Sequence, residues 1–106
     1  MQDEDGGVFF KVSPKRWDAF VSPTESDFNQ KRLILGKSTT SALNFAATLA
    51  FASDVFKNYD SEFAEKCKSV SLKAYAWAKE NNAIPFPNNT EGSGRYAGCR
   101  LEDECF

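Results

Sequence analysis

The cysteines are the first side chains to consider, because a thiol can act as a nucleophile, bind a metal or form a disulfide. The chain has three of them, Cys67, Cys99 and Cys105, and it has no histidine. The absence of histidine excludes Ser-His and Cys-His nucleophile pairs and removes the commonest zinc ligand. Cys99 and Cys105 could form a disulfide that leaves Cys67 free, but the spacing matches no strong zinc pattern. We favour free thiols.

The acidic run at residues 102–104 is the second group that could do chemistry. Carboxylate oxygens are the ligands that hard cations such as calcium prefer. The run also stands just where an apolar segment begins, and acids are favoured in the first turn of a helix by its dipole, by roughly a few tenths of a kcal/mol each. An ion site and a helix start are both compatible with these residues.

Composition limits the classes of protein to which the chain can belong. At 106 residues it has the size of one small domain, and its apolar and charged fractions are ordinary for a globular protein. A net charge of −2 argues against a general nucleic-acid binder, which would show a basic face. No stretch reaches the roughly 20 apolar residues of a membrane span, and no signal peptide is visible. We therefore expect no nucleic acid and no membrane among the partners.

Two helices are expected to position these residues. Residues 38–53 lack charge, and apolar residues recur there at helical spacing, so the pattern predicts a helix over about 39–57 with Ser38 or Thr39 as N-cap. A second helix over about 61–81 should start at Asp60 or Ser61 and carry Trp77 in its buried stripe. The short turn between them predicts an antiparallel hairpin.

The rest of the chain is predicted to be mostly loop. Residues 1–37 and 82–101 are expected to be long loops, with a short strand or extended segment at 8–12, and residues 102–106 look like the start of a further helix. Because the chain stops at this apolar helix start, we expect a domain that is cut short. The small apolar face of the first helix also lacks a large enough partner within these residues.

Four stretches, taken in their order and spacing, resemble the catalytic domain of glycoside hydrolase family nine, the endoglucanase and cellulase family. They are "DGGVFFKV", "KSTTSALNFAATLAFASDVFKNYDSEFAEKC", "AYAWAKEN" and "GSGRYAGCRLEDECF". The resemblance covers residues 5–106. No single motif is decisive, but four in the right order are fairly specific.

The resemblance implies an all-α fold, in which this helical hairpin with long loops is a segment of a six-hairpin (α/α) barrel. It implies a secreted enzyme that hydrolyses β-1,4-glucan with inversion, using an Asp base and a Glu acid. The family's "Asp-Ala-Gly-Asp" type motif and "H-x-R" motif are absent from this sequence. We therefore expect residues 1–106 to be a partial catalytic domain that is inactive alone and has no catalytic residue of its own.

Residue roles follow from the same resemblance. It implies a structural calcium bound by the side chains of Asp103 and Glu104 and by the carbonyls of Cys99 and Arg100, which is an incomplete shell for an ion that takes six to eight oxygens. It also implies four residues that bind the β-glucan polysaccharide: Tyr96, Phe10, Lys11 and Trp17. Alternatives stay open, since Tyr96 could pack on its own loop and Trp17 could plug a local core.

A different class of function is compatible with the residues alone. A helical module that binds a partner protein or a glycan without hydrolysing it would need no catalytic constellation. An excised barrel segment, in contrast, should expose apolar surface and self-associate. The behaviour of the isolated chain in solution distinguishes the two.

Overall fold

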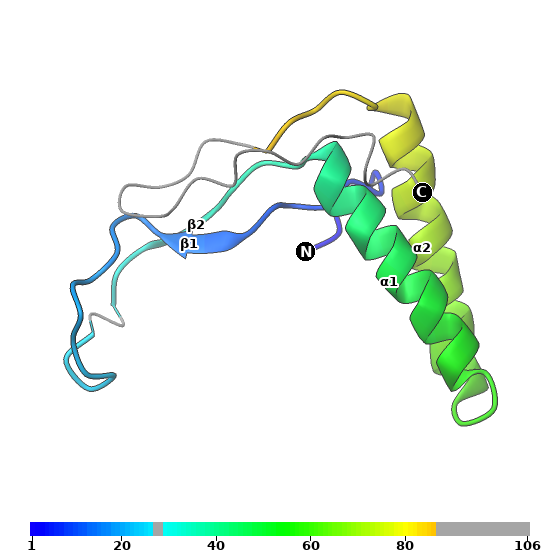
Figure 1. Ribbon diagram of the computed structural model, residues 1–106, viewed down its shortest axis with the longest axis horizontal. Helices are drawn as coiled ribbons and strands as arrows, with labels where there is room; N and C mark the ends of the chain where they lie inside the picture. Colours follow the sequence, from blue (N-terminus) through cyan, green and yellow to red (C-terminus); the bar gives the residue numbers. More distant parts are fainter. Residues whose placement is uncertain (27–28, 87–106) are drawn as a thin grey trace.

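The computed structural model describes residues 1–26 and 29–86, which form two helices and a small antiparallel sheet (Figure 1). The elements are β1 (Val12–Pro14), β2 (Arg32–Ile34), α1 (Thr39–Phe56) and α2 (Ser61–Glu80). The predicted helical hairpin is confirmed. Each helix ends one residue before the position that the sequence suggested.

Both helices begin at side-chain caps. Ser38 precedes α1, and its hydroxyl accepts a hydrogen bond from the Ser41 N–H at 3.1 Å. Asp60 precedes α2 and accepts from the Phe63 N–H at 2.9 Å. Each cap satisfies one of the N–H groups that a helix start leaves unpaired, and the Asp60 cap lies in the short turn between the helices.

Small side chains bring α1 and α2 together. Ala42 and Ala46 on α1 and Ala74 on α2 are all buried in the one core, and buried Ser71 donates a hydrogen bond from its hydroxyl to the Ala46 carbonyl at 2.7 Å. Larger residues at these positions would hold the two backbones apart. The small residues of α1 are therefore explained in part by α2.

Thr39 fastens the open end of the hairpin. Its N–H donates to the Ile84 carbonyl at 2.9 Å, and its hydroxyl accepts from the Ile84 N–H at 3.0 Å. The same hydroxyl donates to the carbonyl of Asn81. The start of α1 and the segment that follows α2 are thereby held side by side.

Residues 8–14 and 32–38 form a two-stranded ribbon, called here the arm, that leads away from the helices (Figure 1). Its strands pair Val12 with Ile34, and Phe9 pairs with Lys37 nearer the helices. The sequence predicted a long loop with a short strand or extended segment at 8–12. In the structure this stretch is paired through isolated bridges and hydrogen bonds, and the regular strand follows at Val12–Pro14. Since the pairing joins residues about twenty positions apart, no local pattern revealed it.

Many large apolar side chains stay exposed on the outer faces of the helices. Phe51 on α1 is 72% exposed, and Leu72 and Tyr75 on α2 are 62% and 51% exposed. Such surface suits a hairpin that packs against further chain, as the sequence led us to expect. None of the helices among the described residues is long and apolar enough to cross a membrane.

Candidate functional site

The N-terminal acidic turn, residues 3–7, is folded by its own polar groups. The Asp5 carboxylate accepts a hydrogen bond from the Gly7 N–H at 2.9 Å, and the Asp3 N–H donates to the Gly7 carbonyl at 2.8 Å. Gly6 has a φ of 98°, in the left-handed region that favours glycine. The "DGG" sequence is therefore a local requirement of this turn.

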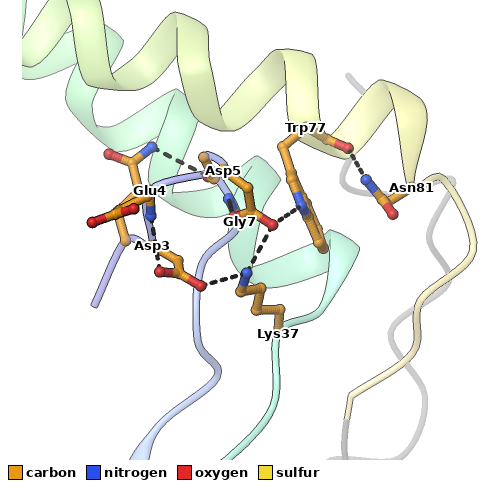
Figure 2. A network of polar contacts seen from close by, with 9 residues as sticks. Asp3, Glu4, Asp5, Gly7, Lys37, Trp77 and Asn81 are labelled. Carbon is orange, nitrogen blue, oxygen red and sulfur yellow. Dashed lines mark hydrogen bonds and ion pairs between the residues drawn. The ribbon is translucent and has the colours of Figure 1, made fainter.

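A network of four side chains, called here the clamp, ties this turn to both helices (Figure 2). It consists of Asp3, Asp5, Lys37 and Trp77. The Lys37 Nζ lies 2.6 Å from Asp3 Oδ2 and 2.8 Å from Asp5 Oδ2. The Trp77 Nε1–H donates to the same Asp5 oxygen at 3.1 Å. Asp5 is thus shared between α2 and the residue that precedes the N-cap of α1.

The clamp shifts the pKa of each of its ionisable groups. The hydrogen bond from Lys37 lowers the pKa of Asp3, with help from the Glu4 N–H. Lys37 also lowers the pKa of Asp5, with smaller effects from the Gly7 N–H and the Trp77 indole. Hydrogen bonds to Asp3 and Asp5 in turn raise the pKa of Lys37.

These directions define the pH range in which the clamp stabilises the fold. The depressed carboxyl pKa values give a contribution that is present above the unfolded value of about 4 and is lost as the pH falls through the folded values. The raised Lys37 pKa gives a contribution present below about 10.4 and lost as the pH rises through the folded value. We expect the melting-temperature difference between wild type and Lys37→Met to be constant from pH 5 to 9 and to shrink below about pH 4. A difference that already shrinks near pH 6 would contradict this assignment.

Phe10 and Lys11 lie on the arm just beyond the clamp. The Phe10 ring packs against Phe86 with 4.6 Å between centroids, and the Lys11 Nζ lies 5.3 Å from the centre of the Phe10 ring. Their backbones pair across the arm, since the Phe10 N–H donates to the Gly36 carbonyl and the Lys11 carbonyl accepts from the Leu35 N–H. Phe10 is therefore half-buried against the chain itself, and Lys11 is held beside it.

Trp17 follows β1 at the far end of the arm and is 50% exposed. It lines a groove of about 530 Å³ together with Asp18, Gln30 and Arg32. The Gln30 side-chain oxygen accepts from the Arg16 N–H at 2.7 Å, which links the two limbs of the loop that forms the groove. Val12, Pro14 and Val21 line the same groove, so its walls are mixed, apolar and polar, and include the exposed indole.

The remaining predicted site residues lie outside the described residues. These are Tyr96, the proposed sugar contact, and the calcium ligands Cys99, Arg100, Asp103 and Glu104. Cys67, in contrast, is described and is a buried free thiol. Within residues 1–26 and 29–86, no group of three or more His, Cys, Asp or Glu side chains could hold a metal ion.

The clamp is the group of interacting side chains that was not predicted from the sequence. Trp77 was predicted as a core residue, and its burial confirms that, but its indole N–H also has a polar partner. Asp5 and Trp77 are 72 positions apart, and nothing in the sequence indicates that they meet. The sequence contains only two local signals for the clamp: the acidic "DGG" turn and Lys37, directly before the Ser38 cap.

Comparison with known proteins gives a consistent result over the whole chain. Residues 1–106 match the sequence profile of glycosyl hydrolase family 9. The xyloglucan-specific endo-beta-1,4-glucanase BoGH9A of Bacteroides ovatus is 34% identical over 118 aligned positions, which cover 100% of this chain and 20% of that protein. Endoglucanase D of Acetivibrio thermocellus is 32% identical over 90% of this chain and 15% of its own length.

Solved structures agree with the sequences. The thermostable endoglucanase of Alicyclobacillus acidocaldarius, as its D468A mutant, matches with a TM-score of 0.86 and 29% identity, over 99% of this chain and 20% of that one. The Bacteroides ovatus GH9 structure matches with a TM-score of 0.81 and 32% identity, over 98% and 21% of the two chains. The chain thus spans about a fifth of the length of these relatives, and the predicted fold class, a segment of an (α/α) barrel, is confirmed.

Proposed function

The chain belongs to glycosyl hydrolase family 9, and on that premise we propose that it forms one wall of the substrate cleft in an enzyme that hydrolyses β-1,4-glucan with inversion. Relatives named as endoglucanases support the substrate class. The arm supports the role of this segment, because it leads away from the helices and Trp17 follows its first strand, β1.

The exposed indole of Trp17 is the observation that carries this role. Glucose rings present apolar C–H faces and a polar rim, so a flat ring bordered by hydrogen-bonding groups suits them. Trp17 lines one groove together with Asp18, Gln30 and Arg32, at the end of the arm. Phe10 acts differently in this proposal, because its contact with Phe86 makes it a support for the cleft wall.

The reaction itself requires two carboxyl groups that we place outside residues 1–106. Inversion uses one carboxylic acid to protonate the leaving oxygen and one carboxylate to activate water, about 6.5–9.5 Å apart. The acidic side chains Asp3 and Asp5 are both occupied by Lys37, so they are poor candidates for either part. We accordingly propose that this segment alone does not cleave glucan.

The test uses the complete gene product that contains these residues. It should hydrolyse soluble β-1,4-glucan and release the α-anomer first, as seen in the anomeric region of a proton NMR time course. Trp17→Ala should raise KM roughly 2- to 10-fold. The control is Phe20→Ala, which removes a fully exposed aromatic ring that does not line the groove and should leave KM unchanged. Retention of configuration, or equal effects of the two substitutions, would contradict the proposal.

We also propose a structural calcium for the parent domain, bound through Asp103 and Glu104 and the carbonyls of Cys99 and Arg100. Four oxygens suit this hard cation but leave its shell incomplete, so further ligands would come from elsewhere. Calcium at 100 times its dissociation constant should stabilise the complete gene product by about 2.7 kcal/mol. Asp103→Asn should abolish the rise in melting temperature on adding calcium. An equal rise in that variant would rule the site out.

A further inference from the structure

The clamp occupies the base of the arm, where the arm leaves the helices. Lys37 belongs to the arm, through its pairing with Phe9, and directly precedes the Ser38 cap of α1. Asp5 precedes the other strand of the arm and is hydrogen-bonded to Trp77 of α2. The Asp5 carboxylate therefore joins Lys37, on the other limb of the arm, to Trp77 of α2 (Figure 2).

The turn at the base is seated tightly against α2. A Cβ atom added to Gly6 would lie 2.6 Å from the carbonyl oxygen of Lys73. A Cβ added to Gly7 would lie 2.6 Å from Lys37 Cδ and 2.7 Å from Trp77 Cε2. Packing this close holds the turn in a single position on α2. The turn therefore defines the direction in which residues 8–14 leave the helices.

Farther out, the arm has little support from the helices. Among the described residues, neither β1 nor β2 makes backbone-level contact with α1 or α2. Ile34 is 64% exposed, and Val12 is 45% exposed. Val8 and Leu35, nearer the base, are buried. The contact of the arm with the two helices is thus made at its base, while farther along Phe10 packs against Phe86 and Ser13 is buried.

We propose that Lys37 is a positioning residue: by drawing Asp3 and Asp5 together beside Trp77, it sets the direction of the arm and hence the place of Trp17 in the cleft. This inference rests on the proposed function for its link to substrate. The effect of the clamp on the direction of the arm does not depend on what the protein binds.

The lysine is suited to this role because it neutralises two carboxylates at once. Without its charge, Asp3 and Asp5 would repel each other at the base of the arm. Lys37→Met removes that charge and retains most of the aliphatic stem. Lys37→Arg keeps the charge and can donate to both carboxylates, so it should restore the arm. Asp3→Asn removes one of the two ion pairs of Lys37. Its effect on the arm should lie between wild type and Lys37→Met.

The experiment is hydrogen–deuterium exchange with mass spectrometry, together with steady-state kinetics, on the complete gene product. In Lys37→Met, amides of residues 8–14 and 32–36 should exchange roughly 5- to 10-fold faster, while the central turns of α1 and α2 are unchanged. KM for soluble glucan should rise about 3- to 10-fold, with kcat altered less than about 2-fold.

The matched control is Lys57→Met, which removes an exposed ion pair with Asp54 at the other end of α1. It should change neither arm exchange nor KM. If Lys37→Met fails to fold, Asp3→Asn is measured in its place, and it should show smaller increases in arm exchange and in KM. Faster exchange spread evenly over the arm and both helices would overturn the proposal, as would unchanged exchange in the arm. If the wild type neither binds nor cleaves glucan, the proposed function fails, and the exchange pattern still decides what the clamp does.

Discussion

Replacing Trp77 by alanine is expected to lower the free energy of unfolding by about 3–5 kcal/mol, the usual cost of deleting a buried large aromatic side chain. Trp77 is only 8% exposed and packs with Val8, Ala74 and the core residues of α1. Its loss also leaves Asp5 without the indole hydrogen bond. Urea denaturation followed by far-ultraviolet circular dichroism measures the change.

The second tryptophan provides the control for this experiment. Trp17 is 50% exposed at the far end of the arm, so Trp17→Ala should lower the free energy of unfolding by less than about 1 kcal/mol. Trp77→Phe keeps an aromatic side chain but loses the N–H and part of the ring volume, so we expect a smaller loss than for Trp77→Ala. Equal losses at positions 17 and 77 would show that the core has been misassigned.

Gly6→Ala is expected to lower the free energy of unfolding by about 2–4 kcal/mol, although it adds only one methyl group. Two effects combine in this substitution. The φ of 98° is unfavourable for a residue that carries a Cβ, and the new Cβ would lie 2.6 Å from the carbonyl oxygen of Lys73. Since that atom belongs to the backbone of α2, it cannot move aside as a flexible side chain could.

Gly36→Ala is the matched control for that prediction. Gly36 is exposed, and among the described residues Gly6 is the only glycine with a positive φ. The control should therefore change the free energy of unfolding by less than about 1 kcal/mol. Thermal melts of the two variants side by side test the contrast, and similar melting temperatures would argue against the strained turn.

The helical part of the fold could be predicted because its signals are local. Ser38 and Asp60 are typical N-caps, and both cap helices in the structure. The uncharged, small-sided stretch before Phe56 identified a helix that must pack closely, and Ala42 and Ala46 do so. Caps and periodicity act within a few residues, so a single sequence contains them in full.

The arm and the clamp could not be predicted, because they depend on pairs that are distant in sequence. β1 is three residues long and ends at Pro14, so it has little strand character of its own. The ion pairs of Lys37 join it to a turn more than thirty positions earlier. For Tyr96 and the residues around Asp103, the resemblance remains the basis of the assignment.

Membership of a family of much longer proteins explains why the helices expose apolar faces. Phe51 and Leu72 are large apolar side chains without cover in the described residues, and this chain spans only 20% of the length of BoGH9A. In a barrel of paired helices, both faces of a hairpin meet neighbours. Neighbours on both sides would account for the large apolar side chains that these helices leave exposed.

The length of the arm makes small changes at its base consequential. Residues 8 to 14 span roughly 20 Å at about 3.3 Å per residue, so the base acts as the pivot of a lever. A rotation of about 3° there would displace the far end by roughly 1 Å. The close seating of Gly6 and Gly7 against α2 therefore limits the angles at which the arm can leave the helices.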